Sequence, residues 1–461
     1  MNSIKVDDIL ELEIKRIGIN GEGIGYYNRL AIFVDQALPN EVVEVKITEL
    51  KDQYAIAENL RVIEESPYRL PVLLPDLAKT GSYGMQHVEY NYMLSQKREI
   101  LINSLRRYLK NEIQLNRIKK TVGLPDPFGY RNKVSLPVRK ISGHNVFGFY
   151  ESGSNVFVPI NESPVQHPKI NQITQDLEKI LDQFKFDAYI QKEKSGYLKS
   201  VVIRRTHYHG EIQVSFLVMK KFPQISQVVE KLVSLHPEIK SVYEFFSNDY
   251  KEQTFFTKDY QRVFGKDTIN EKLNDQTFSL YPESFWQLNT PIADLFYQKM
   301  IKLAKLTGNE MVIDAYAGIA AISHYAYKDA KKIYAIEIDQ KSVQSANLSL
   351  KRNHIKNVTV VQSDFTKALK NLGEQVIDVM FFDPPRGGLG YKTVKEIFKY
   401  KPRKIIYGSC NPSTLAKDLA DLLKEYNLVE ITPFDMFPFT PLVESVTLLV
   451  LKETPLTEIR T

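Results

Sequence analysis

Residues 311–339, MVIDAYAGIAAISHYAYKDAKKIYAIEID, decide the fold of this chain. The stretch begins with an apolar strand pattern, turns at AYAG, continues as a helical segment and ends in a second strand pattern, KIYAIEID. Two apolar strands joined by a helix predict neighbouring strands of a parallel sheet. Ligands of such open sheets bind in the crevice at the carboxyl ends of the strands. The turn after MVIDA is therefore the first place to expect a site.

The same alternation continues to the end of the chain. Further strand patterns follow, each separated from the next by a helical segment or a loop: VTVVQSD (358–364), VIDVMFFDPP (376–385), KIIYGSC (404–410), VEITPFDMF (429–437) and SVTLLVLKE (445–453). Apolar runs of this length between helices predict a doubly wound, Rossmann-like α/β domain. We expect it to span residues 291–461.

Acidic residues stand at the tips of three successive strand patterns, namely Asp314, Glu337 and Asp364. The turn 314–320 lets backbone approach a ligand, Glu337 can accept from both ribose hydroxyls, and Asp364 can accept from an adenine amine. The G-x-G-x-x-G spacing needed for a pyrophosphate is absent, so S-adenosylmethionine, which carries no phosphate, fits better than a dinucleotide. Each acid taken alone can also be a helix cap.

Two later strand patterns end in reactive residues. VIDVMFF runs into Asp383-Pro384-Pro385-Arg386, where consecutive prolines stiffen the loop. KIIYGS runs into Cys410, and the helix that follows carries Ser413 and Thr414, which we expect to be its caps. A helix N-terminus favours a thiolate, although a lone cysteine is otherwise commonly a small buried hydrophobe.

A candidate base lies near the end of the chain. Glu444 stands among apolar neighbours, where burial suits a carboxylate to accept a proton, although a lone glutamate before a strand is usually a surface residue. A thiolate, a base and S-adenosylmethionine are needed together for methylation of a pyrimidine at carbon 5. Attack of Cys410 on carbon 6 would make carbon 5 nucleophilic, and Glu444 would remove the carbon 5 proton afterwards. The target nucleotide must be flipped out or unpaired.

Composition is that of a multidomain soluble protein. The chain has 461 residues, a net charge of +6 and a single cysteine, which excludes disulfides within the chain and cysteine-cage metal sites. No membrane span or secretory signal is apparent, so we expect a cytoplasmic protein. Residues 97–140 hold twelve basic and three acidic residues, a net +9, which makes them a candidate phosphate-binding face or simply a solvated helix surface.

The first part of the chain reads as two further domains. Residues 1–62 contain five short strand patterns with glycine-rich turns, which predict a small closed barrel of the oligonucleotide-binding kind. We expect Gly21, Gly23 and Gly25 to lie between strands, where positive φ or a sharp bend needs them. A linker over 65–75 precedes an α+β domain over 75–290, which opens with a basic amphipathic helix over 92–109.

These motifs in this order resemble the bacterial RNA uracil-5-methyltransferases. The resemblance rests on five stretches: FWQLN (285–289), the turn 314–318, DPPR (383–386), SCNP (409–412) and the segment 437–444. Residues 1–62 resemble the TRAM domain that many members carry, and Tyr130-Arg131-Asn132-Lys133 matches a stretch of their central domain. The likeness covers essentially the whole chain.

The resemblance implies Cys410 as nucleophile and Glu444 as proton acceptor. It implies S-adenosylmethionine contacts at Gln287, Tyr316, Gly318, Glu337, Asp364 and Asp383. For Asp383 it leaves open whether the carboxylate touches the methionine end of the cofactor, orients the uracil, or both. It implies RNA contacts at Arg131 and Lys133, a monomer, and RNA as the partner, with 23S ribosomal RNA favoured over transfer RNA.

Departures from the family pattern leave alternatives. Members with a four-iron cluster carry C-G-G-C where this chain reads Thr80-Gly81-Ser82-Tyr83, and another cysteine at Ser163, so we expect no iron–sulfur cluster, no metal site, and packing by Tyr83 in its place. Ala320 stands where a second glycine is usual and Ala321 where a polar residue is common, which would weaken cofactor binding. A weakly active or non-catalytic RNA-binding paralogue is one alternative, and methylation of cytosine or another pyrimidine position is a second.

Overall fold

The computed structural model describes residues 4–109, 113–251, 254–373 and 375–452. The chain divides into two compact units. The first unit comprises Met1–Pro125, Pro385–Val394 and Ser409–Thr447, and the second comprises Asp126–Pro384, Lys395–Gly408 and Leu448–Thr461. Among the described residues, no helix has both the length and the apolar character that crossing a bilayer requires.

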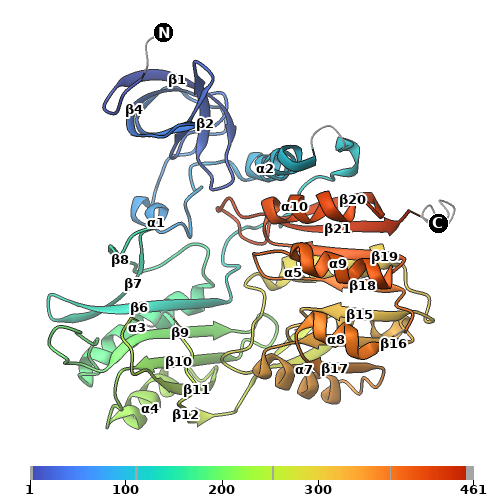
Figure 1. Cartoon of the computed structure of the whole chain (residues 1–461). Coiled ribbons are helices and arrows are strands. Elements are labelled where there is room, and N and C mark those ends of the chain that lie inside the picture. Colours follow the sequence, from blue (N-terminus) through green and yellow to red (C-terminus); the bar gives the residue numbers. More distant parts are fainter. Residues whose placement is uncertain (1–3, 110–112, 252–253, 374, 453–461) are drawn as a thin grey trace. The chain divides into compact units, whose positions relative to one another are not determined.

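The N-terminal strands of the first unit close into a barrel, drawn in blue in Figure 1. Its strands are β1 (Ile9–Ile17), β2 (Gly23–Tyr27), β3 (Leu30–Val34), β4 (Val42–Leu50) and β5 (Tyr54–Glu64), in the order β1-β2-β3-β5-β4. Alternate side chains such as Leu12, Ile14 and Val45 fill the interior, as the period of two along a strand dictates. The predicted barrel and its five strands are confirmed.

The glycines of this barrel differ from the expectation. Gly21 does adopt a positive φ of 93° in the turn before β2, but Gly23 and Gly25 lie inside β2 with ordinary backbone. A Cβ on Gly25 would stand 2.5 Å from Leu12 Cγ, and one on Gly23 would stand 2.7 Å from the Ala37 carbonyl oxygen. Close approach of neighbouring chain, rather than a turn, requires these two glycines.

The rest of the first unit is helical with one strand beside it. It contains α1 (Pro75–Lys79), α2 (Tyr90–Leu109), a short 3₁₀ turn (Leu115–Arg117), α10 (Pro412–Leu422) and β20 (Tyr426–Phe434). Helix α2 packs against α10, and Ile118 and Val122 form parallel bridges to Ile431 and Phe434 of β20. The predicted basic helix is thus present, and it packs on the C-terminal part of the chain.

A mixed seven-stranded sheet, which we call the central sheet, forms the first half of the second unit. Its order is β12-β11-β10-β9-β6-β7-β8, with these bounds: β6 (Lys133–Ile141), β7 (His144–Tyr150), β8 (Phe157–Pro159), β9 (Leu198–Arg205), β10 (Ile212–Val218), β11 (Ile239–Phe246) and β12 (Tyr260–Gly265). Helices α3 (Pro168–Gln183) and α4 (Ile225–Leu235) supply apolar side chains to one core with β6, β7, β9, β10 and β11 (Figure 1). They therefore cover a single face of this sheet.

The second half of the second unit alternates strands and helices. After the hairpin β13 (Ile269–Leu273) and β14 (Gln276–Leu280) come α5 (Thr290–Ala304), β15 (Met311–Ala315), α6 (Ala321–Ala326), β16 (Lys332–Glu337), α7 (Gln340–Arg352), β17 (Val358–Gln362), α8 (Phe365–Leu372), β18 (Val379–Phe382), α9 (Gly390–Tyr400), β19 (Lys404–Ser409) and β21 (Glu444–Leu451). Within the second unit the strand order of this sheet is β17-β16-β15-β18-β19-β21. Strands β15 to β19 pair in parallel, so the predicted doubly wound sheet is confirmed.

Candidate active site

The turn after β15 is built from residues in the left-handed region of backbone space. Tyr316, Gly318 and Ala320 have φ of 57°, 54° and 62°, which only glycine adopts without strain. The Gly318 amide donates to Glu337 Oε2 at 2.8 Å, and Glu337 Oε1 also accepts from the amides of Ile338 and Asp339. The first two strand tips therefore meet, as the sequence predicts. A carboxylate accepts about four hydrogen bonds, so Glu337 Oε2 keeps capacity for a ligand hydroxyl.

Buried acids surround this turn. Asp314 is fully buried and accepts from the Ser323 amide at 3.0 Å and from the Ser323 hydroxyl at 2.6 Å. Burial raises the pKa of Asp314 to about 7, and the charges of Asp383 and Glu337 add to the shift. Burial likewise raises the pKa of Asp383, which follows β18, to about 7. Carboxyl groups whose pKa values are perturbed in this way are typical of a functional site.

The other predicted cofactor residues have visible local roles. Asp364 is the N-cap of α8 and accepts from the Lys367 amide at 3.1 Å, and its hydrogen bond from the Thr366 hydroxyl lowers its pKa. The cap interpretation therefore accounts for Asp364 without a ligand. The Tyr316 ring stacks on Phe365 with centroids 5.9 Å apart, and Gln287 is 8% exposed.

Asn132 joins the YRNK and FWQLN stretches. Its side-chain amide donates to the Gln287 carbonyl at 2.9 Å and to the Thr290 hydroxyl at 3.0 Å, and it is buried. Asn289 in turn caps α5 by accepting from the Ile292 amide at 3.3 Å. The sequence alone gives Asn132 no role, because its partners lie more than 150 residues away.

Cys410 lies in the first unit, at the start of α10. Asn411 is the N-cap of this helix, accepting from the Ser413 and Thr414 amides at 3.0 and 3.5 Å. The expectation that Ser413 and Thr414 are the caps is therefore wrong: they provide the capped amides, because Asn411 is the residue with extended backbone. The Asn411 side chain also donates to the Arg386 carbonyl at 3.2 Å.

The half-exposed Cys410 borders a small cavity of about 140 Å³. The cavity is lined by Ile19, Asn20, Arg386, Cys410, Asn411, Pro412, Pro441, Leu442 and Val443. Cys410 therefore lines a cavity and directly precedes the N-cap of a helix.

Lys97 holds the segment that leads to Glu444 through an ion pair and two hydrogen bonds. The Lys97 ammonium, fully buried, pairs with Asp435 and donates to the carbonyls of Phe437 and Leu442, both at 2.9 Å. Burial lowers the pKa of Lys97, while the charges of Asp435 and Glu444 oppose that shift. Glu444 itself is 5% exposed at the start of β21. Its predicted burial is confirmed.

The comparisons with known proteins agree with this arrangement. The family model for tRNA (uracil-5-)-methyltransferase matches residues 89–452, and the model for the TRAM domain matches residues 5–60. The chain belongs to the tRNA (uracil-5-)-methyltransferase family. The resemblance drawn from the motifs is thereby confirmed.

Relatives of this family member match along nearly their full length. An uncharacterized RNA methyltransferase of Halalkalibacterium halodurans is 35% identical over 446 residues, covering 95% of this chain and 96% of the relative. One of Bacillus anthracis is 32% identical over 457 residues, 98% of each chain. Among solved structures, Pyrococcus abyssi tRNA (uracil-54, C5)-methyltransferase in complex with S-adenosyl-L-homocysteine aligns with a TM-score of 0.75 and 26% identity, covering 96% of this chain and 100% of that one.

Three cations of the basic segment 97–140 are held by partners within the protein. Lys97 is buried in an ion pair, Arg98 donates to the carbonyls of Ile118 and Lys119, and Lys140 pairs with Asp187. These three cations do not fit an open phosphate-binding face, which is one of the two interpretations that the charge count allows.

The two predicted RNA contacts of this family member are partly buried cations. Burial, with the charges of Arg204 and Arg131, lowers the pKa of Lys133 to about 7, and burial lowers that of Arg131. Arg131 also donates to the Lys133 carbonyl at 3.3 Å. Burial therefore disfavours the charged form of Lys133 relative to that of a lysine on an open surface.

The segment that replaces the cluster motif is closed by aromatic packing. Tyr83 is 9% exposed and meets the Phe439 ring edge-on at 4.8 Å between centroids. Thr80 and Ser82 share a hydroxyl hydrogen bond at 2.8 Å. No group of three or more histidine, cysteine or acidic side chains suited to a metal occurs within the described part of the chain.

Proposed function

We propose that this enzyme methylates carbon 5 of a uridine in RNA through a covalent adduct between Cys410 and carbon 6 of the base. The observation that supports this most directly is the Cys410 sulfur at the edge of a cavity, one residue before the capped N-terminus of α10. That position favours the thiolate, because the helix terminus carries partial positive charge.

S-adenosylmethionine, bound in the crevice of the second unit, supplies an electrophilic methyl group. The residues of the crevice fit it: Glu337 retains acceptor capacity for a ribose hydroxyl, and Asp383 and Asp314 favour a cationic ligand over a phosphate. We assign cofactor contacts to Gln287, Tyr316, Gly318, Glu337 and Asp383. We leave Asp364 as a secondary contact because capping α8 already occupies its carboxylate.

The chain's own residues carry the other steps. The Cys410 thiolate adds to carbon 6 of the uracil, and the electron pair of the 5,6 double bond makes carbon 5 nucleophilic toward the methyl group. Glu444 then accepts the carbon 5 proton, the double bond re-forms, and the thiolate leaves carbon 6. The hydrogen bonds from Lys97 to the Phe437 and Leu442 carbonyls hold the loop that leads to Glu444.

The RNA that carries the target is the finer question. We propose 23S ribosomal RNA, with transfer RNA as the second candidate. The Pyrococcus protein, named for transfer RNA, aligns over 96% of this chain, so the layout of a barrel before a central domain does not separate the two RNA classes. Mapping of 5-methyluridine in both RNAs from cells with and without this protein decides between them.

Tritium release from RNA labelled at carbon 5 of uridine tests the reaction itself. The wild-type enzyme releases tritium with S-adenosylmethionine present, and Cys410→Ala neither releases it nor forms an adduct with RNA. Glu444→Gln forms the adduct and accumulates it, since the carbon 5 proton stays in place. Equal adduct yields from the two variants contradict the assigned roles.

Two other outcomes point to the alternatives. RNA binding without release by the intact protein favours a non-catalytic RNA-binding protein. A modified nucleoside other than 5-methyluridine on mass analysis favours methylation of cytosine or of another pyrimidine position.

A further inference from the structure

The second unit holds a cavity of about 740 Å³ that is lined by none of the residues assigned to the cofactor. It lies on the face of the central sheet opposite α3 and α4. Val134, Leu136 and Val138 of β6 point into the helix-covered core, so the alternate residues Ser135, Pro137 and Arg139 point to the other face.

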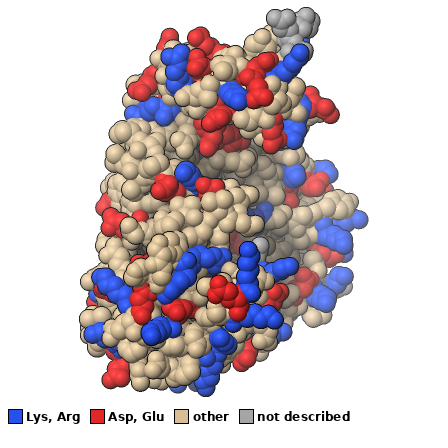
Figure 2. Space-filling model, turned by 90° about the vertical axis from the view of Figure 1, so that its left-hand side faces the viewer, with Lys and Arg blue, Asp and Glu red and all other residues tan. Residues whose placement is uncertain are grey.

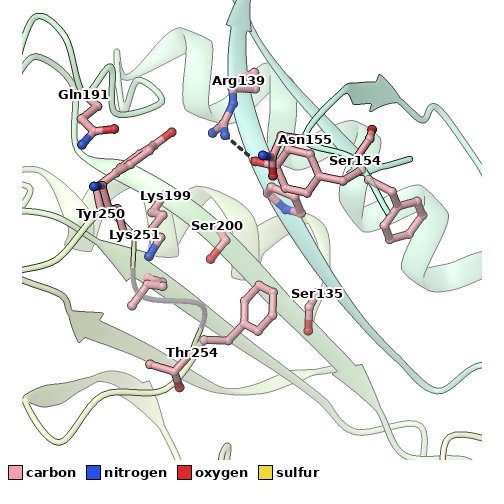
Figure 3. Close-up of a pocket in the computed structure, with 15 residues that line it drawn as sticks. Ser135, Arg139, Ser154, Asn155, Gln191, Lys199, Ser200, Tyr250, Lys251 and Thr254 are labelled. Atoms are coloured by element: carbon pink, nitrogen blue, oxygen red, sulfur yellow. Dashed lines mark hydrogen bonds between the residues drawn. The ribbon is translucent and has the colours of Figure 1, made fainter. Parts of the chain in front are cut away.

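Strand register gives the cavity a floor. Pro137 of β6 pairs with Ser200 of β9, and Ser200 pairs with Leu217 of β10, which places three lining residues in one row across the sheet. The cavity therefore has regular strands as its floor, and described residues that follow β7 (Ser154, Asn155) and β11 (Tyr250, Lys251, Thr254, Phe255) line it as well (Figure 3). Its volume lies within the roughly 300–1,000 Å³ of small-ligand sites.

The side chains around this floor are basic and aromatic. Three cations, Arg139, Lys199 and Lys251, stand with the rings of Phe149, Tyr150, Tyr250 and Phe255, and none of the described lining residues is acidic. Lysines and arginines are numerous in the lower half of the face shown in Figure 2, with acidic residues among them. The cavity thus combines a site for negative charge with several flat apolar faces.

The cations and rings hold one another in place. Arg139 donates to the Tyr150 hydroxyl, and its guanidinium lies 5.6 Å from the centroid of the Tyr150 ring and 5.8 Å from that of Tyr250. Lys199 Nζ lies 5.9 Å from the Tyr250 centroid. Figure 3 shows Arg139 reaching over the cavity between the side of Tyr250 and the side of Asn155. These groups are ordered before any ligand arrives, which lowers the entropy cost of binding.

The floor adds an unused hydrogen-bonding group. Ser200 is 3% exposed, and its hydroxyl has no hydrogen-bond partner among the described residues. A buried hydroxyl without a hydrogen-bond partner costs folding stability. A ligand or a water molecule in the cavity would supply the missing partner.

We propose that this cavity binds an unpaired nucleotide of the RNA other than the target uridine. The base stacks on Tyr150 or Tyr250 and reaches the Ser200 hydroxyl, and the phosphates on either side lie against Arg139, Lys199 and Lys251. Aromatic platforms with cations along the backbone are how proteins hold single-stranded RNA. The inference rests on the proposed function for its choice of RNA as partner.

Affinity for a short single-stranded RNA oligonucleotide of mixed sequence tests the site. Tyr250→Ala weakens binding by roughly 5- to 150-fold, the range for loss of one base–aromatic stack, and Tyr250→Phe retains it. Lys199→Glu weakens binding and lowers the slope of log affinity against log salt by about 1, whereas Lys199→Arg keeps the slope. Lys231→Glu, an exposed charge reversal on α4 on the covered side of the sheet, is the matched control and changes neither.

Steady-state methylation and cross-linking complete the experiment. The pocket variants raise KM for RNA and leave kcat unchanged, because none of their side chains takes part in the chemistry. Ultraviolet cross-linking places RNA on peptides that contain Tyr150 or Tyr250. The proposal is overturned if Tyr250→Ala and Lys199→Glu keep the RNA affinity, the salt slope and the KM of the wild type. It is also overturned if RNA cross-links only to peptides that lack Tyr150 and Tyr250. Failure of the proposed function gives a different result from failure of this proposal. In that case the wild-type protein itself releases no tritium, whether or not the pocket variants bind RNA.

Discussion

Lys97→Met is expected to destabilise the loop that precedes Glu444. The substitution keeps the length and the apolar stem of the side chain but removes the charge and all three hydrogen bonds to Asp435, Phe437 and Leu442. Asp435 is also fully buried, so its carboxylate is left without a counter-charge. Removing one partner of a buried ion pair costs about 3–5 kcal/mol.

Hydrogen exchange of peptides that cover residues 435–443 measures this cost locally. A loss of 3–5 kcal/mol speeds exchange of the protected amides by roughly 150- to 5,000-fold, where exchange follows the opening equilibrium. The double variant Lys97→Met with Asp435→Asn recovers most of the loss, because it leaves no unpaired charge in the interior. Methylation by Lys97→Met falls as well, since Glu444 follows the loosened loop.

Two results would refute this reasoning. If the opening free energy measured by hydrogen exchange in Lys97→Met lies within about 1 kcal/mol of the wild-type value, the ion pair does not hold the loop. Additive effects of the two substitutions would mean that Lys97 and Asp435 act independently, which the double-mutant comparison detects directly.

Three further predictions concern single sites. Ala320→Gly leaves stability within about 1 kcal/mol of the wild type in urea unfolding, because relief of the left-handed φ offsets the lost burial of a methyl group. It also leaves cofactor affinity within about twofold by calorimetry, since the Ala320 methyl is packed in the interior; a tenfold gain would show that the methyl obstructs the cofactor. Asn411→Ala removes the N-cap of α10 and costs about 1 kcal/mol of folding stability, which lowers the thermal midpoint. It also slows adduct formation at Cys410, whereas Asn411→Ser keeps a capping side chain and restores both. His324, whose pKa burial lowers to about 4, stabilises the folded state above pH 6.5, and this contribution fades as pH falls toward 4. The free energy of unfolding of the wild type, relative to that of His324→Gln, therefore falls by about 2 kcal/mol between pH 7 and pH 5. A difference between the two proteins that stays constant over this pH range would contradict the lowered pKa of His324.

The fold was predictable because its signals are local. Apolar runs such as MVIDA and KIYAIEID can pack only as neighbouring buried strands, and the five alternating patterns before residue 64 can bury their apolar faces only by closing on one another. The position of Glu337 was predictable for the same reason, because it is the last residue of an apolar strand and therefore lies at the carboxyl end of the sheet.

The remaining features depend on partners that are distant in the sequence. Lys97 reads as one more charge of a basic helix until Asp435, 338 residues later, is seen beside it. Gly23 and Gly25 look like turn residues until Leu12 and Ala37 close over them. The cavity above the central sheet has no motif, since β6, β9, β10 and two loops each supply only a few of its residues. Charge counting cannot separate a solvated lysine from a buried one.

The central claim is that Cys410 bonds to carbon 6 of the target base. RNA with 5-fluorouridine in place of uridine provides the most direct test, because fluorine at carbon 5 leaves Glu444 no proton to remove and the adduct persists. The account predicts a stable complex that forms only with S-adenosylmethionine present and whose RNA-bearing peptide contains Cys410. Its mass equals protein plus RNA plus one methyl group, less the one hydrogen that the Cys410 thiol loses. A complex on any other residue, or 5-methyluridine formed by Cys410→Ala, would contradict it.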